Sequence, residues 1–264
     1  MGKKQDSTRP YKTAIVLPDL HVPRHDEVTL AAVERYIADC WWDYYVNLGD
    51  FMDFNCISSY NDEYIRRKAG ETVQADYVVG NEVLDRHCKA ARRKNPACEM
   101  VLLEGNHDER MERYIDRNPE LEGIMEPEKM LGLKERGIKW RRSHRLGEGY
   151  KIGRAEFQHG MYLNVHHAKK TALSFGEPIF YGHTHDIQAH SEILRGNNKT
   201  VMAQSLGCLC EYEQGYMRGR PNRWQQAFGV FHFWPDGYFQ PTVVPIFKHR
   251  FVGPTNGKVY DGRR

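Results

Sequence analysis

The stretch 13-TAIVLPDLH-21 decides the fold, because it joins a β-type apolar run to two side chains that can bind a metal ion. The run Thr13–Pro18 predicts a buried strand that ends at Asp19. Asp19 and His21 alternate, and along an extended strand end this spacing would put both side chains on one face. A single Asp-x-His pair is a weak signal, because it occurs often by chance.

Four further polar motifs follow along the chain, and most of them also end a run of β-type residues. They are Gly49-Asp50 with Asp53, Gly105-Asn106-His107-Asp108, His159-Gly160, and Gly182-His183-Thr184-His185. Carboxylate, amide and imidazole groups are the hard and borderline ligands that suit Mn²⁺, Zn²⁺ or Fe rather than a thiolate site. Strand ends far apart in the sequence can therefore present ligands to one crevice.

The residue types within these motifs predict different tasks. Asp50 follows a glycine that lets the backbone turn sharply, and its two carboxylate oxygens can bridge two cations. Asn106 offers a neutral amide oxygen, whereas His107 points elsewhere because adjacent side chains diverge, which leaves it free to donate a proton. Asp53 could orient a neighbour through a hydrogen bond, and Asp108 could hold the His107 ring. His183 and His185 are expected to alternate as Asp19 and His21 do.

Taken in order, the motifs resemble those of the calcineurin-like metallophosphoesterase superfamily, in particular its DNA-repair exonuclease and phosphodiesterase branch. The pattern of that family is DxH, GDxxD, GNH(D/E), H and GHxH, and the match spans residues 19–185, about two-thirds of the chain. The resemblance implies an α/β fold, a four-layer α/β/β/α sandwich of two mixed sheets flanked by helices. It assigns one metal ion to Asp19, His21, Asp50 and His185, and a second to Asp50 as the bridge, Asn106, His159 and His183.

The same resemblance implies a reaction. Two divalent ions, with Mn²⁺ favoured and Fe, Zn²⁺ or Ni²⁺ as alternatives, would clamp the phosphate, and a metal-bridging hydroxide would attack phosphorus. His107 would be the general acid, with Asp53 and Asp108 beside it in the catalytic set. Phe54-Asn55 stand where the protein phosphatase branch continues with Arg-Gly, which disfavours phosphoprotein hydrolysis.

The remaining pattern fits one large domain. Strands alternate with helices up to about residue 181 and a run of strands follows, as expected for two sheets with flanking helices. Asp26 is a predicted N-cap for a helix over Glu27–Cys40, and Thr72–Lys94 is a predicted long helix with Val78, Val79, Val83 and Leu84 inward. Asp236-Gly237 predicts a hairpin turn. We expect a single domain over residues 1–250 and a flexible basic tail over residues 251–264.

Composition excludes several classes of protein. The 264 residues carry a formal charge of only +3, and the six cysteines form no CxxC pair, which argues against a zinc ribbon or a secreted disulfide framework. Met1–Lys12 is polar and no apolar run is long enough to cross a bilayer, so we expect a cytoplasmic protein without a membrane partner.

The substrate is the open question. Arginines near aromatic residues are typical of a single-strand nucleic-acid groove, and Arg218, Arg220 and Arg223 lie in a long segment after the last ligand. His25 and His166 are further candidate substrate-binding residues. Hydrolysis of phosphodiester bonds in nucleic acid or nucleotides is the favoured function. A phosphomonoesterase acting on nucleotides or metabolites is the alternative, and a non-catalytic binding module on the same fold is a third hypothesis, which the intact ligand set counts against.

Overall fold

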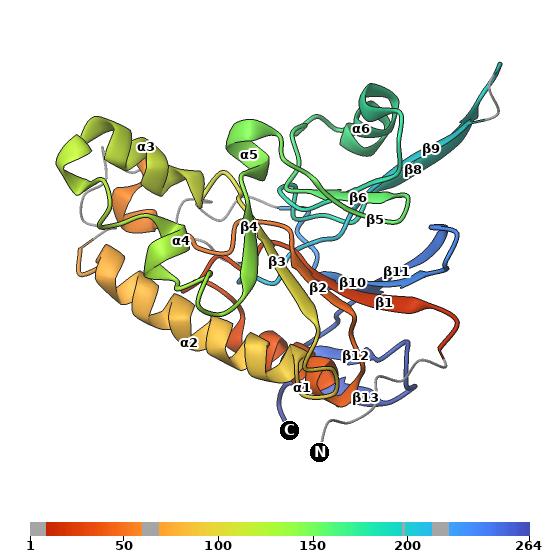
Figure 1. The fold of residues 1–264 in the computed structure, drawn as a ribbon, viewed down its shortest axis with the longest axis horizontal. Coiled ribbons are helices and arrows are strands. Elements are labelled where there is room, and N and C mark those ends of the chain that lie inside the picture. Colours follow the sequence, from red (N-terminus) through yellow and green to blue (C-terminus); the bar gives the residue numbers. More distant parts are fainter. Residues whose placement is uncertain (1–8, 60–68, 197–198, 213–221) are drawn as a thin grey trace.

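Two mixed β-sheets lie face to face and each is covered by helices on its outer side (Figure 1). The computed structural model describes residues 9–59, 69–196, 199–212 and 222–264. The larger sheet has the order β11 (Phe239–Pro245), β10 (Ala227–Phe233), β1 (Lys12–Leu17), β2 (Tyr44–Asn47), β3 (Glu99–Leu103) and β4 (Ile138–Arg141). The smaller sheet has the order β5 (Tyr150–Ile152), β6 (Ala155–Gln158), β7 (Ile179–Tyr181), β9 (Lys199–Ser205) and β8 (Ala189–Leu194).

The helices form the two outer layers. The long helices α1 (Glu27–Asp39) and α2 (Val73–Ala91) cover the larger sheet, and α6 (His167–Phe175) covers the smaller one (Figure 1). The shorter helical segments are η1 (Asn55–Ile57), α3 (Glu109–Arg117), η4 (Pro119–Leu121), α4 (Pro127–Met130) and α5 (Ser143–Leu146). The predicted four-layer α/β/β/α sandwich of two mixed sheets is therefore confirmed.

The core fills the three spaces between these four layers. Along β1, Ile15 and Leu17 belong to the apolar cluster beneath α1 and α2, whereas Ala14 and Val16 belong to the cluster between the two sheets. This alternation is the period of two of a strand, and it explains why a strand buried on both faces is apolar throughout. A third, smaller cluster lies between the second sheet and α6 and includes Ala172.

Strand direction brings the polar motifs to one edge. Strands β1, β2, β3 and β4 are parallel to one another, and β6, β7 and β9 form a second parallel set. Carboxyl ends of parallel strands meet at the same edge of a sheet, and ligand sites in open α/β sheets lie just beyond those ends. The five motifs follow β1, β2, β3, β6 and β7. Both sheets therefore supply motif residues, and these lie together at the carboxyl ends of their parallel strands.

Local signals account for both long helices. Asp26 caps α1 by accepting a hydrogen bond from the Thr29 amide at 2.9 Å, as predicted, and Thr72 caps α2 by accepting from the Ala75 amide. The inward face of α2 includes Val83 and Leu84, but Val78 is 49% exposed, so its predicted inward position is wrong. Residues that line one helix face recur every three or four positions, and Val78 falls outside that series.

The hairpin signal near the end of the chain is confirmed, but the flexible tail is not. Asp236-Gly237 joins the antiparallel strands β10 and β11, and Gly237 has the positive φ of +84° that such turns require. Residues 250–261 are not a loose tail, because β12 (Arg250–Val252) and β13 (Val259–Asp261) pair antiparallel. Phe251 and Tyr260 are buried against Tyr36 of α1, and this packing offsets the entropy of ordering the segment.

No helix within the described part of the chain is both long and apolar enough to span a membrane.

The terminal hairpin is expected to contribute to global stability. Phe251 is 6% exposed and its ring contacts Tyr36, Phe228 and Tyr260 at centroid distances of 4.9–5.6 Å. Phe251→Ala should lower the free energy of unfolding by about 3 kcal/mol, measured by chemical denaturation. The neighbouring Val252→Ala is the control and should change stability little, because Val252 is 57% exposed. Equal stability of the two variants would contradict a docked hairpin.

Candidate metal centre

All five motifs converge on one buried cluster of potential ligands. Asp19, His21, Asp50 and His185 place one ligand atom each within 4.8 Å of one another, and Asp50, His159 and His183 form a second such group. Asn106 adjoins the second group, since its Oδ1 lies 2.9 Å from His159 Nε2. Asp50 belongs to both groups, which is the arrangement expected of a carboxylate shared between two ions.

The ring nitrogens of the first group face one another closely. His21 Nε2 lies 3.1 Å from His185 Nε2 and 3.5 Å from Asp50 Oδ2. His185 Nε2 lies 3.3 Å from Asp19 Oδ1. Two imidazole nitrogens at this separation, with carboxylate oxygens beside them, form a cage of lone pairs, and a divalent cation fits this donor chemistry.

The carboxylates of Asp19 and Asp50 are buried and need positive charge or hydrogen-bond donors nearby. Asp19 and Asp50 are at most 1% exposed, and carboxylates removed from water are costly unless a cation or a hydrogen-bond donor compensates them. Burial, with the neighbouring Asp50 carboxylate, raises the pKa of Asp19 well above its usual value. The residues present therefore fit one or two divalent cations.

His159, in the second group, is held with a lone pair toward the cluster. His159 Nδ1 lies 3.0 Å from the Leu48 carbonyl oxygen, to which it donates, so Nε2 is the unprotonated nitrogen that faces Asp50 at 3.4 Å. Burial lowers the pKa of His159 to about 3, of His183 to about 4 and of His185 to about 3. A neutral imidazole with a fixed tautomer is the form in which histidine binds a metal.

The backbone at the ligands is not extended, which corrects the strand-alternation argument. Asp19, His21, Asp50, His183 and His185 have φ values of +38°, +55°, +48°, +69° and +59°. Left-handed backbone costs roughly 1–2 kcal/mol for a residue other than glycine, and such strain clusters at functional sites. The side chains share a face because tight turns aim them inward, not because a strand period of two aligns them.

Two glycines are required by close approach to the carboxylates. A Cβ atom at Gly105 would lie 2.1 Å from Asp50 Oδ1, and one at Gly182 would lie 2.1 Å from Asp19 Oδ2. Both distances are far below van der Waals contact. The glycine before Asn106 and the glycine before His183 therefore leave room for the two carboxylates.

Asp53, and not Asp108, orients His107. Asp53 Oδ1 lies 2.8 Å from His107 Nδ1 and 3.1 Å from His21 Nδ1, so one carboxylate holds two imidazoles. The predicted contact of Asp108 with the His107 ring is wrong. Asp108 instead accepts hydrogen bonds from the amides of Met52 at 2.9 Å and Gly105 at 2.8 Å, so it ties two motif loops together.

Arg110 is a neighbour of His107 that the sequence did not single out. Its Nη2 donates to His107 Nε2 at 2.9 Å, and its Nη1 donates to the Asp53 carbonyl oxygen at 2.7 Å. Helix α3 begins directly after the third motif, so a residue three positions after His107 returns to the same side of the turn. The spacing His107-x-x-Arg110 at a helix start was the signal that could have identified it.

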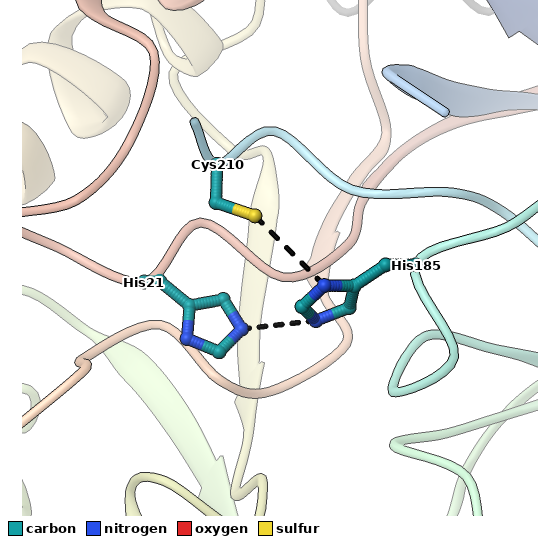
Figure 2. A group of neighbouring side chains, drawn as sticks. All are labelled: His21, His185 and Cys210. Carbon is teal, nitrogen blue, oxygen red and sulfur yellow. Dashed lines mark hydrogen bonds between the residues drawn. The ribbon is translucent and has the colours of Figure 1, made fainter. Parts of the chain in front are cut away.

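Two residues after the last motif, Cys210 and Trp224, contact His185. Figure 2 shows the His185 ring with one nitrogen toward His21 and the other toward Cys210, whose Sγ lies 3.9 Å from His185 Nδ1. The Trp224 ring packs edge-on against His185 at a centroid distance of 4.2 Å. Cys210 and Trp224 therefore place a thiol and an indole beside the first ligand group.

The five candidate substrate-binding residues lie in different surroundings, and two of them are outside the described part of the chain. His25 is 7% exposed and pairs with Glu27, and His166 precedes α6 beside a cleft of about 410 Å³ that Lys169 and Lys170 also line. Arg223 is exposed. Arg218 and Arg220 lie outside the described residues. The substrate roles of all five residues stay predictions.

Comparison with known proteins gives distant relatives. A scan against protein-family models finds no match. The Gene 54 protein of Mycobacterium phage L5 is 26% identical over 266 residues, covering 95% of this chain and 99% of that protein. The Gene 54 protein of Mycobacterium phage D29 is 27% identical over 260 residues, covering 91% and 96%.

Solved structures that match are more distant in sequence. Vacuolar protein sorting 29 from Cryptosporidium parvum has a TM-score of 0.43 at 12% identity, over 91% of this chain and all of that one. Nuclease MPE from Pseudomonas putida has a TM-score of 0.37 at 16% identity, over 87% of each chain. Zinc-bound Vps29 from Entamoeba histolytica has a TM-score of 0.39 at 13% identity, over 88% of this chain and 98% of that one.

The architecture matches the fold class expected from the sequence. Two facing mixed sheets flanked by helices form an α/β/β/α sandwich, and all five motifs meet at one edge of it. The α/β fold class that the resemblance implied is confirmed, and the buried histidine and aspartate groups form a plausible metal site.

An acidic cleft of about 340 Å³ adjoins this site and generates a pH prediction. Asp53, Glu71 and Asp76 are among its lining residues, and burial together with the two other carboxylates raises the pKa of Asp76 to about 7. A carboxyl group whose pKa is higher in the folded than in the unfolded state destabilises the fold as pH rises from about 4 to about 7.

Asp76→Asn should therefore raise the free energy of unfolding at pH 8 by about 1–2 kcal/mol and have little effect near pH 4. Denaturation of both proteins at the two pH values measures this difference. Glu128→Gln, an exposed carboxylate near the start of α4, is the control and should show no such dependence. A gain for Asp76→Asn that is equal at both pH values would contradict the raised pKa.

Proposed function

We propose that this chain is a dinuclear metal-dependent phosphoesterase that hydrolyses phosphodiester bonds, with nucleic acid or nucleotides as substrates. The observation that carries the proposal is the position of Asp50, which belongs to two ligand groups made by loops of both sheets. A carboxylate that belongs to both groups could serve two ions, and paired ions would supply the Lewis-acid activation of water and phosphate that such a reaction needs. The ligands proposed are those assigned from the motifs, four for each ion.

The protein's own contribution centres on His107. In the observed arrangement its Nδ1–H donates to Asp53 and its Nε2 accepts from Arg110, so the ring is neutral. Burial lowers the pKa of His107, which favours this neutral form. To act as a general acid, the ring must exchange its contact with Arg110 for a proton on Nε2, and Asp53 then stabilises the imidazolium.

Charge around the site supports a phosphate ester as the substrate. It also bears on whether that ester is a diester or a monoester. Arg110 places a guanidinium 14% exposed beside His107, suited to the charge of a phosphate group. The cleft beside Asp53 has four carboxylates in its lining, those of Asp53, Glu71, Asp76 and Glu211, and one guanidinium, that of Arg24. This excess of negative charge is unsuited to a second phosphate and favours the alternative, a phosphomonoesterase. The diester proposal requires a polyanion to approach from another side of the site.

The function is tested by a panel of substrates. The wild-type protein with Mn²⁺ should hydrolyse bis-p-nitrophenyl phosphate and single-stranded DNA, and DNA binding should weaken steeply with salt. Asp50→Asn should lose turnover and lower the bound metal, measured by elemental analysis, because both ions lose a ligand. Asp116→Asn, with a carboxylate 60% exposed, is the matched control. Turnover of p-nitrophenyl phosphate alone would replace the diester proposal by the monoesterase, and turnover of no ester with any divalent ion would overturn both.

His107→Ala tests the proton donor separately from the metal site. Turnover should fall by about 10²–10⁴-fold while the metal content stays at the wild-type level, because His107 contributes to leaving-group protonation and not to the ligand set. His190→Ala is a control, since His190 pairs with Glu192 on β8. Normal turnover by His107→Ala, or loss of metal equal to that of Asp50→Asn, would exclude the proposed role.

A further inference from the structure

His144 faces the metal centre but belongs to neither ligand group. Its ring centroid lies 5.9 Å from that of His159 and 6.2 Å from that of His183, the two imidazoles of the second group. The side chain is 30% exposed, whereas the His159 side chain is fully buried. His144 is therefore at the solvent side of the second ligand group, and sequence motifs did not identify it because it stands alone between the third and fourth motifs.

The backbone of His144 is fixed by both neighbouring motifs. Its amide donates to the Glu104 carbonyl oxygen at 3.1 Å, and the next amide, of Arg145, donates to Glu104 Oε2 at 3.0 Å. Glu104 is 1% exposed and directly precedes the third motif. On the other side, Ser143 Oγ accepts from the His159 amide at 3.1 Å. A position tied to two ligand motifs holds its side chain in a defined place relative to the site.

The ring itself has one weak side-chain partner in the described structure. His144 Nε2 lies 3.7 Å from Glu109 Oε2, which is too long for a hydrogen bond, and Glu109 pairs with Arg113 at 3.3 Å. His107, by contrast, has both ring nitrogens engaged within 2.9 Å and packs against His21 in the first group. The imidazole of His144 thus retains an N–H donor for a molecule bound over the second group.

We propose that His144 is a specificity-determining residue that donates a hydrogen bond to a terminal oxygen of the bound phosphate group. The inference rests on the proposed function, because it requires a phosphate ester at the ligand groups. The ring borders the second group at its exposed edge, and it is more exposed than the buried His159. Its chemistry suits an anionic oxygen, since a hydrogen bond to a charged acceptor is stronger than one between neutral groups.

This contact distinguishes two classes of phosphate ester. A monoester has three terminal oxygens and carries more negative charge, whereas a diester has two and presents a second ester substituent in place of the third. A donor at the edge of the site therefore favours the monoester. His144 would set the ratio of monoester to diester turnover without taking part in the bond changes at phosphorus.

The experiment compares His144→Ala and His144→Gln with the wild type on p-nitrophenyl phosphate and bis-p-nitrophenyl phosphate. Loss of the donor should lower kcat/KM for the monoester by about tenfold and for the diester by less than about threefold. His144→Gln keeps an N–H donor and should recover part of the monoester activity. Binding of inorganic phosphate, measured by titration calorimetry, should weaken in His144→Ala while metal content stays unchanged.

His190→Ala is the matched control, because His190 is 24% exposed and pairs with Glu192 on β8, and its ratio should equal that of the wild type. An unchanged monoester-to-diester ratio and unchanged phosphate affinity in His144→Ala would overturn this inference while leaving the proposed function intact. Equal loss on both esters together with loss of metal would also overturn it, because that result assigns His144 to support of the ligands. A wild-type protein that hydrolyses neither ester would overturn the proposed function and this inference together.

Discussion

The structure depends on keeping two aspartates and several imidazoles together in a place that water scarcely reaches. Asp19 and Asp50 are almost fully buried, and several of the surrounding ligand residues have left-handed backbone. Both features cost free energy when considered alone. They persist because the turns are joined to one another: the His21 amide donates to the Asp50 carbonyl oxygen at 2.8 Å, and the His183 amide donates to Asp19 Oδ1 at 2.8 Å. A bound cation would offset the remaining charge.

The layers of the sandwich explain why these turns are held so firmly. Every ligand loop follows a short strand whose side chains are buried, and the strands of the two sheets share the apolar cluster that contains Val16, Val46 and Phe157. A shift of one sheet against the other would disturb this packing along with the ligand positions, because interiors packed at crystal-like density deform little. The terminal hairpin β12–β13 packs against α1 and contacts β11, and this packing stabilises the outer side of the larger sheet.

Around the shared carboxylate, the described residues divide the site into two halves of different chemistry. One half contains His107, Asp53 and Arg110, which hydrogen bonds join to one another, and it borders an acidic cleft. The second contains His159 and His183, with His144 at its exposed edge. Charge and donor placement thus differ across the site, and this asymmetry is what would separate one phosphate ester from another.

The sequence alone determined the order of the strands and long helices up to β11, the ligand types and the class of fold, because apolar periodicity and motif order can be read directly from the chain. It could not determine which carboxylate holds His107, because Asp108 is adjacent in the sequence whereas Asp53 precedes the ring by 54 residues, and only the loop paths bring Asp53 into contact. Nor could it show the turns that aim Asp19 and His21, the docking of Phe251 and Tyr260, or the approach of Arg110, Cys210 and His144. Those contacts form between segments brought together by packing, and their distances depend on tertiary structure that no local pattern records.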